Sequence, residues 1–161
     1  MFEGASTLSV DAKGRIAIPT RYRDDLVEEA NGRLHITRHF QEDCLLLFPE
    51  TEWTAFRERV AAWPMSAAWQ KRIVLSNAVA LDMDVSNGRI LLSPELREAS
   101  RMGKEALLLG NGSHFELWDK QVYAAQETLA RAQALPEALA EFVFGDSGWS
   151  AAQPTSASCC G

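Results

Sequence analysis

The chain has 161 residues, of which 47% are hydrophobic and 24% charged, and its formal net charge is −6. This composition is typical of a globular protein of one ordinary domain or two small ones, and it excludes an intrinsically disordered chain. The apolar runs are far shorter than the roughly 20 residues that span a bilayer, and the N-terminus lacks the features of a secretory signal. We therefore expect a cytoplasmic protein with no membrane partner, and the negative charge argues against indiscriminate binding to nucleic acid.

The chain begins with a predicted strand, a turn and a second strand. Residues 2–10 include an alternation of apolar and polar side chains, as in a strand with one buried face. Asp11-Ala-Lys-Gly14 predicts a turn, because aspartate can cap its own backbone and glycine tolerates a positive φ. Residues 15–18 alternate again, which buries the isoleucines and points Arg15 outward at the tip of a tight hairpin.

The rest of the first half predicts a short helix, two strands and a longer helix. Trp53, Phe56 and Val60 share one face of the longer helix, which indicates core or subunit packing rather than a ligand site. Cys44 lies in an apolar run and is expected to be a small core residue. The first three elements are expected at residues 20–30, 34–38 and 44–48, and the longer helix begins within 49–52 and runs to 62.

The second half repeats much of the first. A constant offset of 74 (88 − 14) places Gly88 on Gly14 and Arg89 on Arg15, in blocks that share a Gly-Arg turn, an apolar strand and a proline. A repeat of this length indicates tandem copies of one supersecondary unit. Strands are expected at 79–81, 89–92, 106–109 and 115–118, and helices at 95–99 and 120–134. Residues 70–75 are expected to continue as a helix, although their apolar residues also suit a strand.

The repeat divides the chain into four expected parts. They are a first repeat with its helix (1–63, core about 5–51), a connecting segment (64–77), a second repeat with its helix (78–134, core about 78–121) and a C-terminal tail (135–161).

The tail differs in character from the repeats. Leu139, Phe142, Val143 and Phe144 predict a short amphipathic segment that docks elsewhere. The small polar residues from Ser147 on predict disorder.

No catalytic or metal-binding constellation stands out. The three histidines, His35, His39 and His114, have no nucleophile motif around them, and the chain has no phosphate loop or dinucleotide fingerprint. Cys159 and Cys160 lack a second Cys or His pair at zinc-ligand spacing. We therefore expect no enzyme activity, no catalytic residue, no metal, no cofactor and no small-molecule ligand.

The basic turns are the stronger candidates for a binding site. A β-ribbon fits the DNA major groove, and an arginine such as Arg15 can take guanine O6 and N7 together or clamp a phosphate. Lys13 would add a phosphate contact, while Asp11 closes the turn and orients the arginine. A Gly-Arg pair after a turn is also common on surfaces with no specific role, so the charge cluster alone leaves both interpretations open.

Several segments of the chain resemble the MraZ family. The match covers about residues 1–134 and includes both repeats in order. The segments that carry it are Met1-Phe-x-Gly-Ala5, Asp11–Arg23, Cys44–Pro49 with Glu52-Trp53, and Phe115–Asp119.

The resemblance implies a fold and a function. The implied fold is mixed α+β and β-rich, with two tandem AbrB-like swapped-hairpin repeats forming a pseudo-dimeric β-barrel flanked by helices. The implied function is a bacterial, nucleoid-associated DNA-binding repressor of the division and cell-wall gene cluster that includes its own gene. Such proteins form a ring-shaped homo-oligomer on short direct repeats of promoter DNA. The Asp-x-x-Gly-Arg motif of the family assigns DNA contacts to Arg15 and Arg89, with Lys13 in support.

Two residues depart from the family pattern. Asp84 lies one residue too far from Arg89, so either the second turn is longer or Val85 replaces the acid. Glu3 stands where the family often has a basic residue. These departures support a second hypothesis, a non-enzymatic interaction or scaffold module that keeps the fold without operator binding.

Overall fold

The computed structural model describes residues 1–142 and divides into two compact units, Met1–Gln126 and a smaller one that begins at Glu127. The predictions for Val143, Phe144 and the disorder from Ser147 on lie outside the described residues.

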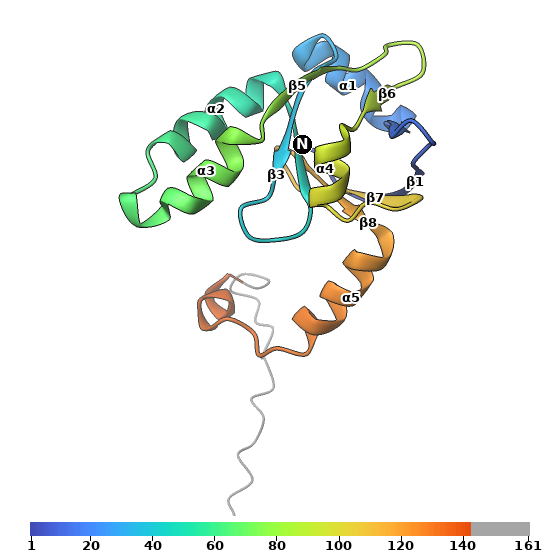
Figure 1. The fold of residues 1–161 in the computed structure, drawn as a ribbon. Coiled ribbons are helices and arrows are strands. Elements are labelled where there is room, and N and C mark those ends of the chain that lie inside the picture. The colour runs from blue at the N-terminus through green and yellow to red at the C-terminus, as the bar shows by residue number, and fades with distance from the viewer. Residues whose placement is uncertain (143–161) are drawn as a thin grey trace, which may run out of the picture. The chain divides into compact units, whose positions relative to one another are not determined.

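The first unit is built on a six-stranded antiparallel sheet and a separate two-stranded ribbon (Figure 1). The sheet has the order β1-β7-β8-β4-β3-β5, and the ribbon pairs β2 with β6. The strands are β1 (Ala5–Ser9), β2 (Arg15–Ala17), β3 (Arg33–Arg38), β4 (Leu45–Pro49), β5 (Val79–Asp82), β6 (Arg89–Leu91), β7 (Glu105–Gly110) and β8 (Phe115–Asp119).

The helices start and stop at the residues that favour such ends. Pro19 and Pro49 immediately precede helices, and Asn31 ends one in the left-handed conformation at φ 52°. The Ser93 hydroxyl caps another by accepting a hydrogen bond from the Leu96 N–H. The helices are α1 (Thr20–Ala30), α2 (Glu50–Ala61), η1 (Met65–Ala67), α3 (Ala68–Ser76), α4 (Pro94–Ala99), α5 (Lys120–Arg131) and η2 (Glu137–Glu141).

The strand pairing crosses between the two repeats. The first strand of each repeat pairs with the third strand of the other, β1 with β7 and β5 with β3, while β4 pairs with β8. This exchange gives the first unit a pseudo-twofold arrangement. The expected pseudo-dimeric β-barrel is not closed in the structure, because β1 and β5 are the edges of an open sheet. Among residues 1–142, the short strands β2 and β6 pair only with each other, and no strand joins those edges.

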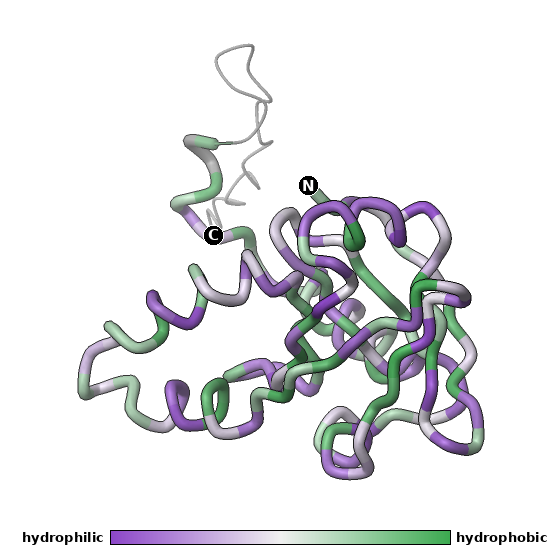
Figure 2. The backbone as a smooth tube through the Cα atoms, turned by 90° about the horizontal axis from the view of Figure 1, so that it is seen from above, coloured by the Kyte–Doolittle hydropathy of each residue, from purple (hydrophilic) through white to green (hydrophobic). Residues whose placement is uncertain are grey.

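The main hydrophobic core lies between one face of the sheet and the ribbon, with α1 and α4 beside it. Ile16 and Ile90 enter it from the ribbon and are at most 2% exposed. Burying a side chain of this size contributes about 1.5–3 kcal/mol, so these isoleucines hold the ribbon to the sheet. Figure 2 shows hydrophobic and hydrophilic stretches alternating along the backbone.

The other face of the sheet packs against helices. Leu46 and Phe48 of β4 point to this side and form a second cluster with Trp53 and Val60 of α2. The expected packing role of that α2 stripe is confirmed. Cys44 is buried in a third cluster beside α5, as predicted from its apolar surroundings. Within the described residues, no helix is both long and apolar enough to cross a membrane.

Candidate nucleic-acid interface

The register of the ribbon sets which side chains face outward. Ile16 lies opposite Ile90, and both are buried. The residues on either side of each isoleucine must therefore face away from the core. Arg15 lies opposite Leu91 and Arg89 opposite Ala17, so the two arginines share the outward face on one diagonal. Diagonal neighbours on such a ladder are about 7–8 Å apart.

This arrangement corrects the expected hairpin. Arg15 was expected at the tip of a hairpin between the first two strands, but β2 does not join the β1 ladder. Two backbone hydrogen bonds close the turn, from the Asp11 N–H to the Arg15 carbonyl and from the Gly14 N–H to the Asp11 carbonyl, both at 3.0 Å. The partner of β2 is β6, because only that pairing buries Ile16 against Ile90.

The first turn holds Arg15 in place. Asp11 Oδ1 accepts hydrogen bonds from the N–H groups of Lys13 at 2.9 Å and Arg15 at 2.8 Å. Asp11 Oδ2 accepts one from Arg15 Nε at 2.7 Å. The expected turn-closing and orienting role of Asp11 agrees with this geometry. The terminal amino groups of Arg15 make no hydrogen bond within the described chain and so can reach a ligand.

These hydrogen bonds lower the pKa of Asp11 from its ordinary 3.8 to about 2, mainly through the Arg15 backbone N–H. Because the folded pKa is depressed, the stability from this carboxylate is fully present above pH 3.8 and is lost as the pH falls through about 2.

We expect NMR titration of the Asp11 carboxyl to give a pKa near 2. In Arg15→Ala it should rise only part of the way, since the backbone donor remains. A wild-type pKa of 3.8 would contradict this turn geometry.

The second turn is one residue longer than the first. The Asp84 N–H donates to the Arg89 carbonyl at 3.0 Å, as that of Asp11 does to Arg15, so Asp84 is the equivalent acid and Val85 is not its replacement. Asp84 Oδ1 instead accepts hydrogen bonds from Ser86, and Asn87 Oδ1 accepts from the Arg89 N–H at 2.9 Å. The Arg89 side chain is exposed and makes no hydrogen bond within residues 1–142.

Two further arginines tie the turns together crosswise. Arg23 Nε donates to the Ile18 carbonyl at 2.7 Å, and its guanidinium lies against Gly88 of the other repeat. Arg97 lies 74 residues after Arg23 (97 − 23), the offset that relates the two repeats. It makes the equivalent contacts from the second repeat to the first. Its Nε donates to the Leu92 carbonyl at 3.2 Å and its guanidinium lies against Gly14.

The two glycines themselves contact the opposite strand ends. The Gly88 carbonyl accepts from the Ile18 N–H at 2.8 Å, and the Gly14 carbonyl from the Leu92 N–H at 2.9 Å. Sequence reasoning did not assign a role to Arg23 and Arg97, although the offset that relates them was visible. Their crosswise contacts depend on tertiary structure.

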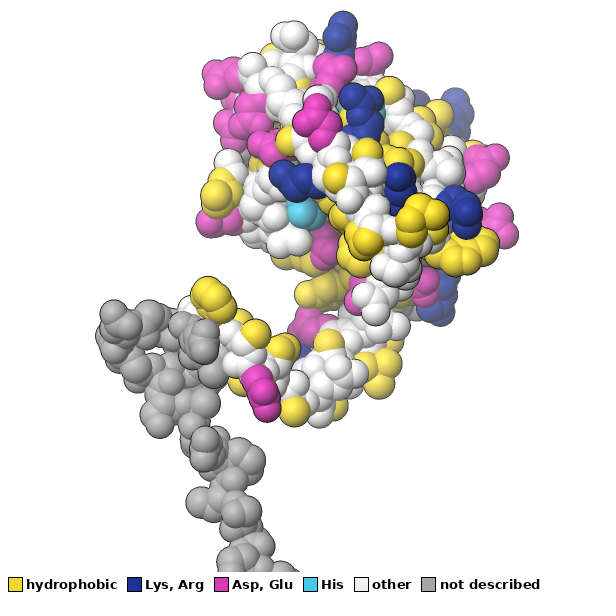
Figure 3. All heavy atoms as spheres, turned by 90° about the vertical axis from the view of Figure 1, so that its left-hand side faces the viewer, with side chains coloured by type: hydrophobic (Ala, Val, Ile, Leu, Met, Phe, Trp, Pro, Cys, Tyr) yellow, Lys and Arg dark blue, Asp and Glu magenta, His cyan; other side chains and the backbone are white. Residues whose placement is uncertain are grey.

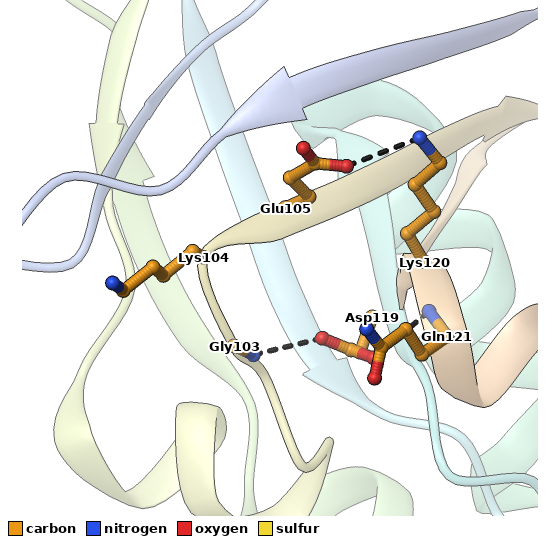
Figure 4. Close-up of a pocket in the computed structure, with 6 residues that line it drawn as sticks. All are labelled: Gly103, Lys104, Glu105, Asp119, Lys120 and Gln121. Atoms are coloured by element: carbon orange, nitrogen blue, oxygen red, sulfur yellow. Dashed lines mark hydrogen bonds and ion pairs between the residues drawn. The ribbon is translucent and has the colours of Figure 1, made fainter.

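A concave site lies at the start of α5, and its polar lining groups are paired with one another (Figure 4). Asp119 accepts hydrogen bonds from the backbone N–H groups of Gly103, Gln121 and Val122. Lys120 pairs with Glu105 at 3.1 Å. The helix N-terminus is therefore already neutralised by a carboxylate, and this site is a poor anion-binding candidate.

The histidines do not add charge to the ribbon at neutral pH. Burial lowers the pKa of His35, His39 and His114 below 6.5, since desolvation disfavours the charged imidazole. No group of three or more potential metal ligands occurs among the described residues.

Fold and site together define a class, a β-rich α+β protein of two tandem repeats that displays its arginines on a shared ribbon. The family model described as "MraZ protein, putative antitoxin-like" matches residues 1–75 and 74–141. The chain belongs to the MraZ family.

Individual relatives agree with this assignment. The transcriptional regulator MraZ of Burkholderia mallei (strain SAVP1) is 56% identical over 144 residues, which cover 89% of this chain and 100% of the relative. Those of Burkholderia thailandensis and Burkholderia ambifaria (strain MC40-6) have the same identity over the same length. MraZ is a family of transcriptional regulators and not of enzymes, so the expectation of a non-enzymatic protein is confirmed.

Proposed function

We propose that this chain is a sequence-specific DNA-binding regulator, a repressor of the division and cell-wall gene cluster that includes its own gene. One observation carries the proposal: Arg15 and Arg89 lie on the same outward face of a ribbon whose two turns are tied together. The relatives named as transcriptional regulators support it.

The ribbon enters the major groove of DNA with its arginine face toward the bases. A two-stranded ribbon fits this groove, and each guanidinium can take guanine O6 and N7. The diagonal of about 7–8 Å is close to two base-pair steps of about 3.4 Å, so Arg15 and Arg89 can read base pairs that lie two steps apart. Lys13 is exposed on the first turn and contacts a phosphate.

Assembly reconciles this function with a net charge of −6. DNA experiences mainly the nearby basic ribbon, since charges are screened beyond about 8 Å at physiological salt. A ring-shaped homo-oligomer on short direct repeats adds the weak contacts of its subunits, which can raise avidity by about 10²–10⁴. The protein acts in the cytoplasm on nucleoid DNA and needs no cofactor.

The proposed organisation follows the repeats. The exchange of β1 and β5 between them supports an AbrB-like swapped-hairpin arrangement. The proposed parts are 1–63, 64–77, 78–134 and the tail 135–161, of which residues from 143 on lie outside the described structure.

Salt dependence of binding to the chain's own upstream DNA tests the proposal. Log affinity should fall with log salt at about −0.9 per phosphate contacted. Lys13→Ala should flatten the slope by about 1 for each Lys13 that contacts a phosphate. The exposed Lys120, which pairs with Glu105, supplies the control Lys120→Ala, whose slope should stay unchanged.

Scrambled DNA should bind with the non-specific affinity alone. Failure to shift the upstream DNA at low salt would reject DNA binding. It would favour the interaction or scaffold module instead, which the exposed Glu3 and the differing second turn also support.

A further inference from the structure

The α2–α3 end of the first unit carries an exposed apolar groove, which we call the α3 groove. Figure 3 shows this side of the molecule, where hydrophobic side chains lie beside basic ones. Ala68, Arg72 and Leu75 recur at i, i+4 and i+7 along one face of α3. The groove encloses about 300 Å³ and is lined by Trp63, Pro64, Met65, Ala68, Lys71, Arg72, Leu75 and Ser76.

The groove is apolar in its walls and basic at its rim. Met65 is 90% exposed, which is unfavourable for a large apolar side chain. Lys71 donates to the Ala61 carbonyl at 3.0 Å, and the Arg72 guanidinium lies 4.4 Å from the ring centre of the exposed Trp69. Such a surface suits an apolar segment that carries negative charge.

The second unit contains a segment with the matching chemistry, residues 135–142. Leu135 and Phe142 are 61% and 78% exposed. Leu139 and Phe142 are three residues apart around η2, so they share one side of it. Glu137 opens this helix, and no lysine or arginine follows Arg131 in the chain.

We propose that the 135–142 segment of one copy docks in the α3 groove of a second copy. The apolar side chains of the segment enter the groove, and Glu137 lies against Arg72 at its rim. A segment on one copy and a groove on the next form a heterologous contact, the type that closes into rings. The inference rests on the proposed homo-oligomer and names the surfaces that build it.

Photo-crosslinking of the full chain tests which surfaces meet. Phe142 is replaced by p-benzoylphenylalanine in an unlabelled copy, which is mixed with an excess of ¹⁵N-labelled wild type and irradiated. We expect adducts between the unlabelled segment and labelled peptides from residues 63–76. Adducts elsewhere, adducts within one copy alone, or none would overturn the proposal.

Charge reversal tests the rim contact. Arg72→Glu should weaken assembly at least tenfold, measured by light scattering against concentration, and adding Glu137→Arg should restore it. Arg57→Glu is the matched control, since this exposed arginine on α2 does not line the groove. If Arg72→Glu does not change the size of the oligomer, the docking proposal is refuted while the proposed homo-oligomer still stands. A wild type that stays monomeric would refute both.

Discussion

Replacing Arg15 by alanine should eliminate the shift of the chain's own promoter DNA while leaving the oligomer intact. One bidentate arginine–guanine contact is worth about 1–3 kcal/mol of discrimination. When several subunits bind direct repeats together, each subunit loses this binding free energy. The measurement is fluorescence anisotropy against promoter DNA, beside light scattering for size. Retained promoter binding would refute the assignment of Arg15.

The fold should survive this change. The partner of Arg15 is Asp11 on an exposed turn, and exposed ion pairs contribute little to stability. The exposed Arg59 on α2 supplies the matched control, because Arg59→Ala removes the same charge away from the ribbon. Its promoter affinity should equal that of the wild type.

Arg89→Ala should weaken binding less than Arg15→Ala. Arg15 is held by Asp11 before DNA arrives, whereas the Arg89 side chain has no such hydrogen bond in the described chain. An unrestrained arginine loses more conformational freedom on binding, which reduces its net contribution. An equal or larger loss for Arg89→Ala would contradict this account of the asymmetry.

Replacing Gly88 by alanine should lower the free energy of unfolding by about 2–4 kcal/mol, from left-handed backbone strain and steric overlap together. Gly88 has φ 71°, and a Cβ there would lie 2.8 Å from the Ile18 carbonyl oxygen and would also displace Arg23. The backbone atom cannot move aside as a side chain does. Urea unfolding measures the loss, provided the m-value stays constant.

Gly112→Ala separates strain from overlap. Gly112 also has a positive φ, 82°, but a Cβ there meets nothing within 4 Å. Only the left-handed cost of about 1–2 kcal/mol should remain. Adding Arg23→Ala to Gly88→Ala should recover part of the lost stability, because it removes the overlap with the Arg23 side chain. The recovery should be incomplete, because the overlap with the Ile18 carbonyl oxygen remains. Equal losses for Gly88→Ala and Gly112→Ala would show that the crossing of the two repeats adds no constraint.

Local sequence patterns predicted the elements well because their causes are local. Pro19 and Asn31 flank α1 as expected, and the apolar alternation around Ile16 and Ile90 correctly marked which ribbon face is buried. Helix α5 is shorter than the expected 120–134 and ends at Arg131, because the helix-favouring residues continue beyond the part that packs against the sheet.

The sequence by itself determined the repeat, its two Gly-Arg turns and the side chains that face outward, since each follows from residue type and alternation. Only the tertiary structure decided that β2 pairs with β6 and that the sheet stays open. It also decided that Arg23 and Arg97 cross to the glycines of the opposite repeat. The alternation of apolar and polar residues predicts which face of a strand is buried, but it does not predict which strand lies beside it. That choice depends on the joint burial of Ile16 and Ile90, 74 residues apart (90 − 16).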